Sequence, residues 1–141
     1  SGNHLGKKLL KAIFNGKAPD DIKDEFKKEY PSLDLSLLLE QLYKNPSPNK
    51  FLASFSPFIN SHRKNPFIQE MIKLSFHEFL VEFVVDFSTD EPLLIGFQGS
   101  VAWAYHDLLK QVIEERKMKL GPIIKQPIEK LLEYHLTKYS L

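Results

Sequence analysis

Apolar residues recur at helical spacing from residue 5 to residue 87 and predict a series of helices. Gly16 is placed to end the first helix, and Pro19 is placed at the first position of the second. Asp34 can cap a third helix. The apolar positions of that helix are expected to be buried: Leu35, Leu38, Leu39 and Leu42.

Prolines set the predicted boundaries in the middle of the chain. Residues 45–49, Asn-Pro-Ser-Pro-Asn, predict a loop, and residues 51–61 predict a short helix that Pro57 interrupts or restarts. Asn65-Pro66 pairs a cap with a first helical residue and opens the longest helix. The second half of this helix carries a face that we expect to be buried: Phe76, Phe79, Leu80, Phe83, Val84 and Phe87.

The pattern changes after residue 92. Residues 93–97 and 120–125 are short apolar runs typical of buried strands, whereas residues 101–113 and 127–136 repeat apolar positions at helical spacing. The order strand, helix, strand, helix predicts a parallel βαβα unit with a right-handed crossover.

The predicted fold class is therefore α/β and rich in helices, with about seven helices for two strands. Two parallel strands are marginal alone, because parallel sheets normally contain several strands covered on both faces. We expect the chain to be part of a larger α/β domain, with further strands upstream or on a partner chain. A helix-rich domain with a small sheet is the alternative.

Composition excludes several classes of protein. With 43% hydrophobic residues in 141, the chain can form a core, and 19 basic against 18 acidic residues give no surplus for nucleic acid or anionic membranes. Without cysteine it can form no disulfide, thiolate nucleophile or cysteine-ligated cluster. The longest uncharged run is too short for a membrane helix. We expect a soluble, cytoplasmic protein.

The candidate binding element follows the first predicted strand. Gly99 and Ser100 lie between that strand and the helix opened by Val101 and Ala102. Ligands of open α/β sheets bind at the carboxyl ends of strands, and a helix start offers free N–H groups. The turn matches neither a P-loop nor the dinucleotide fingerprint, and Gln98 is too large for a serine nucleophile elbow. An ordinary strand-to-helix connection is the simpler alternative.

Two other features have a structural and a functional interpretation. Trp103 lies off the apolar face of its helix and could stack on a base or meet another lobe, but exposure or packing on a neighbouring helix is the simpler interpretation. Glu78, Glu82 and Asp86 form a polar stripe that we interpret as a solvated face rather than a metal site. No metal site is predicted.

Several spaced segments carry a family resemblance. They are Phe97–Tyr105, Leu108-Leu109, Leu120-Gly121-x-Ile123-Ile124 and Pro127–His135, preceded by Ser1–Leu10 and Pro48–Phe55. In this order they resemble the C-terminal end of the BadF/BadG/BcrA/BcrD ATPase family, in its N-acetylglucosamine kinase-like branch. The similarity extends over essentially the whole chain.

The resemblance implies an actin-like ATPase with two ribonuclease H-like lobes and ATP between them. Residues 1–141 would be most of the C-terminal lobe, with a helical part over 1–87 and a nucleotide-binding part over 92–141. The N-terminal lobe, with the family's phosphate loop and its catalytic aspartate, would be absent. No catalytic residue is therefore assigned to this chain, and the chain alone is expected to be inactive.

By the same resemblance, the nucleotide site would comprise Gly99, Ser100, Val101, Ala102 and Trp103. The implied parent enzyme phosphorylates N-acetylglucosamine or a similar amino sugar with ATP and Mg²⁺. The chain would interact with ATP, with that sugar and with the N-terminal lobe, and the resemblance is compatible with a homodimer. Neither nucleic acid nor a membrane is expected as a partner.

Two alternatives stay open. One is an activator-type ATPase of the same family, against which the lack of cysteine counts, because those members carry a cysteine-ligated cluster. The other is a non-catalytic helical interaction module.

Overall fold

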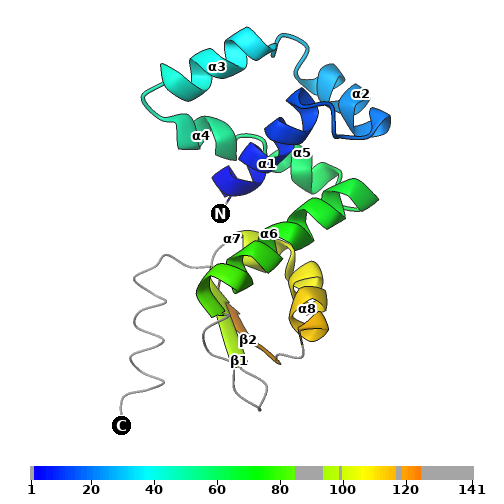
Figure 1. Cartoon of the computed structure of the whole chain (residues 1–141), viewed down its shortest axis with the longest axis vertical. Helices are drawn as coiled ribbons and strands as arrows, with labels where there is room; N and C mark the ends of the chain where they lie inside the picture. Colours follow the sequence, from blue (N-terminus) through cyan, green and yellow to red (C-terminus); the bar gives the residue numbers. More distant parts are fainter. Residues whose placement is uncertain (1, 85–93, 99, 117–118, 125–141) are drawn as a thin grey trace. The chain divides into compact units, whose positions relative to one another are not determined.

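A computed structural model describes the backbone of residues 2–84, 94–98, 100–116 and 119–124, with side chains for 2–80 and 101–116 (Figure 1). The predicted helix at 127–136 lies outside the described residues. The chain divides into two compact units, here named the helical unit (Gly2–Met71) and the mixed unit (from Ile72 onward).

The helical unit consists of short helices joined by tight connections (Figure 1). Its elements are α1 (Gly2–Phe14), α2 (Asp20–Glu29), α3 (Leu35–Tyr43), α4 (Pro48–Ala53), α5 (Ser56–Ser61) and the first turns of α6 (Pro66–Val84).

The predicted ends of these helices are confirmed at three positions. Gly16 has a φ of +72°, and Lys17 N–H donates to Ala12 O at 2.9 Å, which is the bonding of a glycine-terminated helix. The Asp34 carboxylate accepts from Leu37 N–H at 2.8 Å and caps α3. The amide oxygen of Asn65 likewise accepts from Phe67 N–H at 2.9 Å at the start of α6.

Two proline predictions need correction. Pro19 is the capping residue before α2 rather than its first residue, because its ψ of 159° is extended. The loop predicted over 45–49 is shorter, since α4 begins at Pro48, where the lack of an N–H costs nothing. The helix predicted over 51–61 was expected to be either interrupted or restarted at Pro57. The structure shows a restart, because Pro57 lies in the first turn of a new helix, α5.

Phe26 is the centre of an aromatic cluster in the helical unit. Its ring lies 5.8 Å from that of Phe55 and 5.5 Å from that of Phe58, between ring centroids. Tyr30 and Phe14 contact the same ring at 4.8 and 6.5 Å. Phe26, Phe55 and Phe58 are almost completely buried, so the cluster forms the core of this unit.

α1 and α4 pack with their backbones in close contact. A Cβ atom added at Gly6 would lie 2.0 Å from the carbonyl oxygen of Leu52, so only glycine fits. Leu5, Leu9 and Leu10 of α1 are buried beside this contact.

The buried face predicted for α3 is wrong. Only Leu38 is buried, whereas Leu35 and Leu39 are 57% and 44% exposed and Leu42 is half-buried. Among its neighbours in the helical unit α3 packs against α4, and one helix covers only a narrow strip of another.

The mixed unit contains the remainder of α6 together with β1 (Leu94–Gln98), α7 (Ser100–Ala104), α8 (His106–Glu115) and β2 (Lys119–Ile124). β1 and β2 pair in parallel, with Leu94 opposite Lys119 and Gln98 opposite Ile124. The fold is helix-rich, as predicted. The predicted βαβα unit is not shown as a whole, because its last helix lies outside the described residues.

The core of the mixed unit is mainly aliphatic. Its buried side chains include Ile72, Phe76, Leu80, Ala102, Tyr105, Leu108, Leu109, Val112 and Ile113. Phe79, predicted to be buried, is 42% exposed, since it lies about 100° around α6 from the buried Leu80. The side chains of Phe83, Val84 and Phe87 are not among those described. Within the described part of the chain, no helix is both long and apolar enough to span a bilayer.

Candidate functional site

The predicted nucleotide element lies where β1 ends and α7 begins. β1 ends at Gln98 and α7 starts at Ser100, so a single residue, Gly99, separates strand from helix. Gly99 itself lies outside the described residues. The predicted order of strand and then helix is therefore present.

The parallel pairing brings two strand ends to the same edge. Gln98, the last residue of β1, is paired with Ile124, the last residue of β2. α7 packs against both strands (Figure 1). The start of α7 thus lies at the carboxyl edge of the strand pair, the edge at which open α/β sheets bind ligands.

The described side chains of α7 divide between the interior and the surface. Ala102 is 4% exposed and anchors the helix, Val101 is half-buried, and Trp103 is 51% exposed. The simpler interpretation of Trp103 as an exposed residue thus fits, and its position leaves the indole accessible. The first turn of α7 contains no acidic residue that would repel an anion.

The single helix predicted over 101–113 is two helices. Tyr105 departs from helical geometry, with φ −116° and ψ 34°, and separates α7 from α8. The carbonyl oxygen of Trp103 lies 3.1 Å from His106 Nδ1, so a side chain supplies the partner that an unbroken helix would provide from its backbone.

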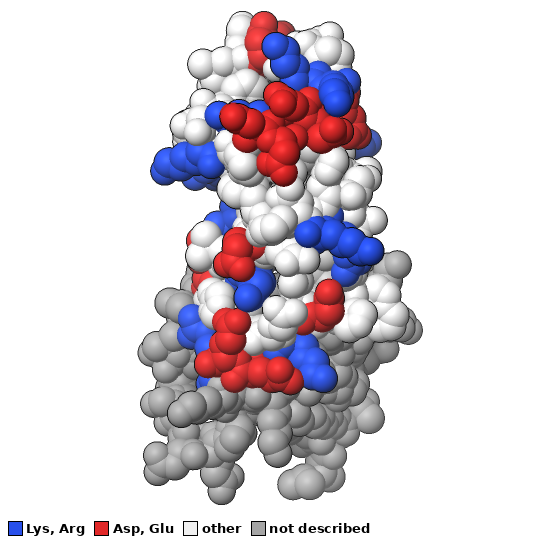
Figure 2. Space-filling view, turned by 90° about the vertical axis from the view of Figure 1, so that its right-hand side faces the viewer, with Lys and Arg blue, Asp and Glu red and all other residues white. Residues whose placement is uncertain are grey.

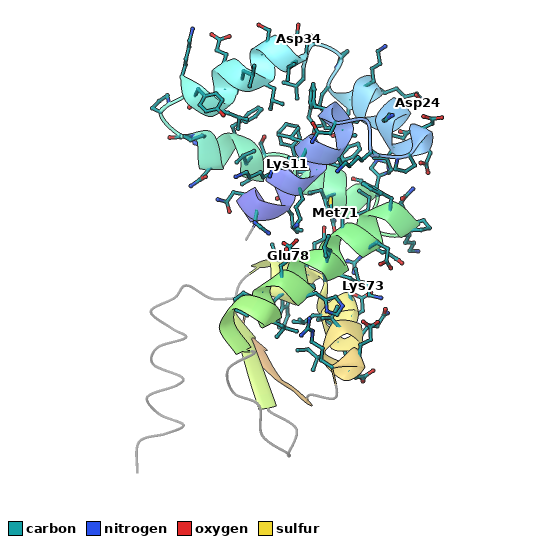
Figure 3. The ribbon with its side chains drawn as sticks, viewed as in Figure 1. Lys11, Asp24, Asp34, Met71, Lys73 and Glu78 are labelled. Carbon is teal, nitrogen blue, oxygen red and sulfur yellow. The ribbon has the colours of Figure 1, made fainter. Side chains whose placement is uncertain are left out.

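A polar cluster joins α6 to the end of α8, and the sequence analysis did not identify it. Arg116 Nε donates to His77 Nδ1 at 3.0 Å, His77 Nε2 lies 3.2 Å from Glu115 Oε2, and Lys73 Nζ lies 3.2 Å from Glu115 Oε1. Figure 3 labels Lys73 on α6. Only the packing of two helices reveals this cluster, because its halves are 38 and 39 residues apart.

The hydrogen bonds of the cluster fix the form of the histidine. Because Arg116 can only donate, His77 Nδ1 must accept, and the ring proton of neutral His77 is on Nε2, facing Glu115. The hydrogen bond from Lys73 lowers the pKa of Glu115 below its ordinary 4.5, with smaller contributions in the same direction from His77, against a rise from burial.

These four side chains bond from one helix to the other, so we interpret the cluster as a connection between α6 and α8. No group of three His, Cys, Asp or Glu side chains in the described part of the chain is arranged to hold a metal ion. Glu78 of the predicted polar stripe, labelled on α6 in Figure 3, is exposed, whereas the side chains of Glu82 and Asp86 lie outside the described set.

Charge on the visible surface is mixed. Figure 2 shows acidic and basic side chains interspersed over the face that it presents, in keeping with the formal charge of +1. This face therefore gives no large single-sign field.

Among three comparisons with known proteins, only the one with solved structures gives a match. No family model matches the chain, and no curated protein matches it. A solved structure does. The match is to a putative N-acetylglucosamine kinase. This protein comes from Porphyromonas gingivalis, and its crystal structure superposes on the chain with a TM-score of 0.79 at 36% sequence identity.

The similarity to this N-acetylglucosamine kinase covers 99% of the present chain but 48% of the solved one. The chain therefore spans about half the length of the structure that it matches. Both units are included in a similarity of this extent, which supports a kinase-like origin for the whole chain. Nothing in the comparison tests the predicted site at 99–103.

Proposed function

We propose that this chain forms the nucleotide-binding C-terminal part of an ATP-dependent kinase that phosphorylates N-acetylglucosamine or a similar amino sugar. The observation that carries the proposal is the 36% identity, over 99% of the chain, to a putative N-acetylglucosamine kinase. Similarity maintained over both units favours this function over an unrelated helical interaction module.

In this proposal ATP binds where β1 meets α7. The N–H groups of Ser100 and Val101 would face the ligand, Ala102 would anchor the helix in the core, and Trp103 would cover the adenine or ribose. Gly99 would let the backbone approach the ligand closely. The supporting geometry is the position of α7 at the carboxyl edge of two parallel strands.

The sugar hydroxyl would be activated by a base outside this chain. Magnesium would enter with the phosphates of ATP and offset their charge, and no described residue is assigned to it. The role of the chain itself is to bind and orient the nucleotide, so that the transferred phosphoryl group meets the sugar in the correct geometry.

The activity is tested with the full-length protein that contains this chain, in a coupled assay with ATP, Mg²⁺ and N-acetylglucosamine. We expect sugar-dependent ADP release, and none from the 141-residue chain alone. Turnover by the chain alone would contradict the assignment of the base to another segment. ATP hydrolysis by the full-length protein without sugar phosphorylation would favour an activator-type ATPase.

The site is tested separately by Gly99→Val in the full-length protein. A side chain at this position should keep the backbone away from the ligand and so weaken ATP binding by at least about tenfold. The affinity for the sugar should stay within about twofold of the wild-type value. Unchanged ATP affinity by calorimetry would exclude the proposed site without excluding the kinase activity.

A further inference from the structure

The short helix α7 ends beside the proposed nucleotide element, and a side chain completes its last turn. Tyr105 N–H donates to Val101 O at 3.0 Å, so the backbone closes the turn up to this residue. Tyr105 itself leaves helical geometry, and carbonyl groups at a helix end need partners from elsewhere. The Trp103 carbonyl oxygen has such a partner in the His106 ring, whose Nδ1 lies 3.1 Å away.

This bond requires one form of the histidine. A carbonyl oxygen can only accept, so His106 Nδ1 must carry a proton, and the neutral ring is the Nδ1–H form. His77 has the opposite arrangement, because its Nδ1 accepts from Arg116 and its proton is on Nε2. The two histidines are therefore expected to be different tautomers when both rings are neutral.

The His106 ring is attached to a rigid support. His106 is the first residue of α8, and Leu109 N–H donates to Tyr105 O at 3.0 Å directly after the break. Leu108 and Leu109 are 3% and 0% exposed, so the start of α8 is fixed in the core. A bond from this support to Trp103 therefore holds the end of α7 in place.

Trp103 depends on a fixed backbone because its indole is not held by the core. Its side chain is 51% exposed, whereas Ala102 and Tyr105 are each 4% exposed. With little packing around the ring, the directions open to the indole are the rotamers that its own main chain allows. A hydrogen bond to the carbonyl of Trp103 fixes that main chain and thereby limits those directions.

We propose that His106 is a positioning residue for Trp103: its bond to the Trp103 carbonyl aims the indole at the purine ring of the bound nucleotide. The inference rests on the proposed function, in which Trp103 covers the adenine or ribose. His106 does not itself touch the nucleotide and acts only through the backbone of Trp103. An aromatic side chain already held in one orientation loses less entropy when a ring stacks on it, so ATP binds more tightly.

Two substitutions separate the Nδ1 bond from the rest of the side chain. The amide nitrogen of Asn lies about where Nδ1 lies, whereas that of Gln reaches about as far as Nε2. In the full-length protein His106→Gln should weaken ATP binding about fivefold, the ratio that corresponds to one net hydrogen bond, and His106→Asn should stay within about twofold of the wild type. Calorimetry measures both affinities, and equal losses for the two variants would overturn the proposal.

The action through Trp103 is tested by combining variants in the full-length protein. In a Trp103→Ala background His106→Gln should have no further effect on ATP affinity, because the side chain that His106 positions is gone. Two losses of affinity that simply add would show that His106 acts on another group and would overturn the proposal.

NMR of the unliganded full-length protein separates this inference from the proposed function. The indole N–H signal of Trp103, assigned by its loss in Trp103→Ala, should shift in His106→Gln and keep its position in His106→Asn. Ring ¹⁵N shifts should place the proton on Nδ1 of His106 and on Nε2 of His77 when both rings are neutral. A wild type that binds no ATP would contradict the proposed function and leave these signals to decide whether His106 positions Trp103. A wild type that binds ATP but has the Nε2–H form at His106, or an indole signal that neither substitution moves, would overturn the positioning role.

Discussion

The helical unit and the mixed unit use their polar groups differently. In the helical unit Asp34 and Asn65 accept hydrogen bonds from backbone N–H groups two or three residues away and cap the starts of helices. In the mixed unit the Arg116, His77 and Glu115 side chains bond across α6 and α8. The helical unit also has a long-range bond, in which Asn65 Nδ2 donates to Asp21 Oδ2 at 2.8 Å. The difference is therefore that this long-range bond is a single contact, whereas in the mixed unit several side chains form a connected cluster between two helices.

The interiors of the two units differ as well. The helical unit has stacked and edge-on rings around Phe26, whereas α8 contributes Leu108, Leu109, Val112 and Ile113 to the mixed unit. We infer that the helical unit is a packing module and that the mixed unit carries the nucleotide element.

Phe26→Ala should have the largest effect on stability. Loss of the central ring leaves a cavity among aromatic neighbours and should cost about 3–5 kcal/mol of unfolding free energy. Hydrogen exchange should show the loss in the helical unit first, since the ring contacts of Phe26 given above lie within it. Tyr43→Ala, at an exposed aromatic of the same unit, is the control. Equal losses for the two variants would remove the packing argument.

Gly6→Ala should have the second-largest effect and lower the free energy of unfolding by about 1–3 kcal/mol. The new methyl group would overlap the Leu52 carbonyl and push α1 away from α4. Gly2→Ala is a matched control in the same helix, since its nearest neighbour is the Ser56 hydroxyl at 3.0 Å, which can rotate away. Chemical denaturation measures both. A Gly6 variant as stable as the Gly2 variant would contradict the close packing of α1 on α4.

Asp34→Ala should cost about 1 kcal/mol, the usual effect of losing a helix cap. Asp34→Asn keeps an acceptor oxygen for Leu37 N–H and should retain most of the stability. Thermal unfolding of the two variants distinguishes the hydrogen bond from the charge. If Asn is as damaging as Ala, the carboxylate charge matters more than the cap.

Glu115→Gln should have the smallest effect on stability, and this effect should depend on pH. The folded pKa of Glu115 is lowered, so its contribution is complete above the unfolded value and is lost as the pH falls through the folded pKa, below 4.5. The wild type should be slightly more stable than the variant at pH 7, and the difference should disappear once the pH has fallen below the folded pKa. Half-exposure of the carboxylate keeps the effect small.

Glu114→Gln on the neighbouring residue is the control, because Glu114 pairs with Lys110 at 4.0 Å within the same helix rather than across helices. A stability difference for Glu115→Gln that stays constant from pH 7 to below the folded pKa would contradict the role of the ionised carboxylate.

Local signals account for what the sequence could predict of the fold. Gly16, Asp34 and Asn65 act on backbone groups within a few residues, so the sequence alone indicated their roles. The burial of Leu35 and Leu39 was predicted wrongly, since apolar spacing shows which residues share a face but not whether a neighbour covers it.

The candidate site shows the same limit. The strand and the start of α7 were predictable from apolar runs and a Gly-Ser pair. The break at Tyr105 was not, because apolar spacing continues through it and the bond from His106 to Trp103 replaces a helical one. The cluster around His77 was beyond local signals, because it depends on how α6 and α8 pack.

The central claim, that ATP binds the mixed unit at α7, is tested most directly by NMR of the ¹⁵N-labelled chain during titration with ATP and Mg²⁺. Trp103 is the only tryptophan, so its indole N–H gives a single assignable signal beside the proposed site. We predict saturable shifts of that signal and of the backbone amides at 100–103, with the amides of the helical unit unchanged. Shifts confined to the helical unit, or none at millimolar ATP, would contradict the account.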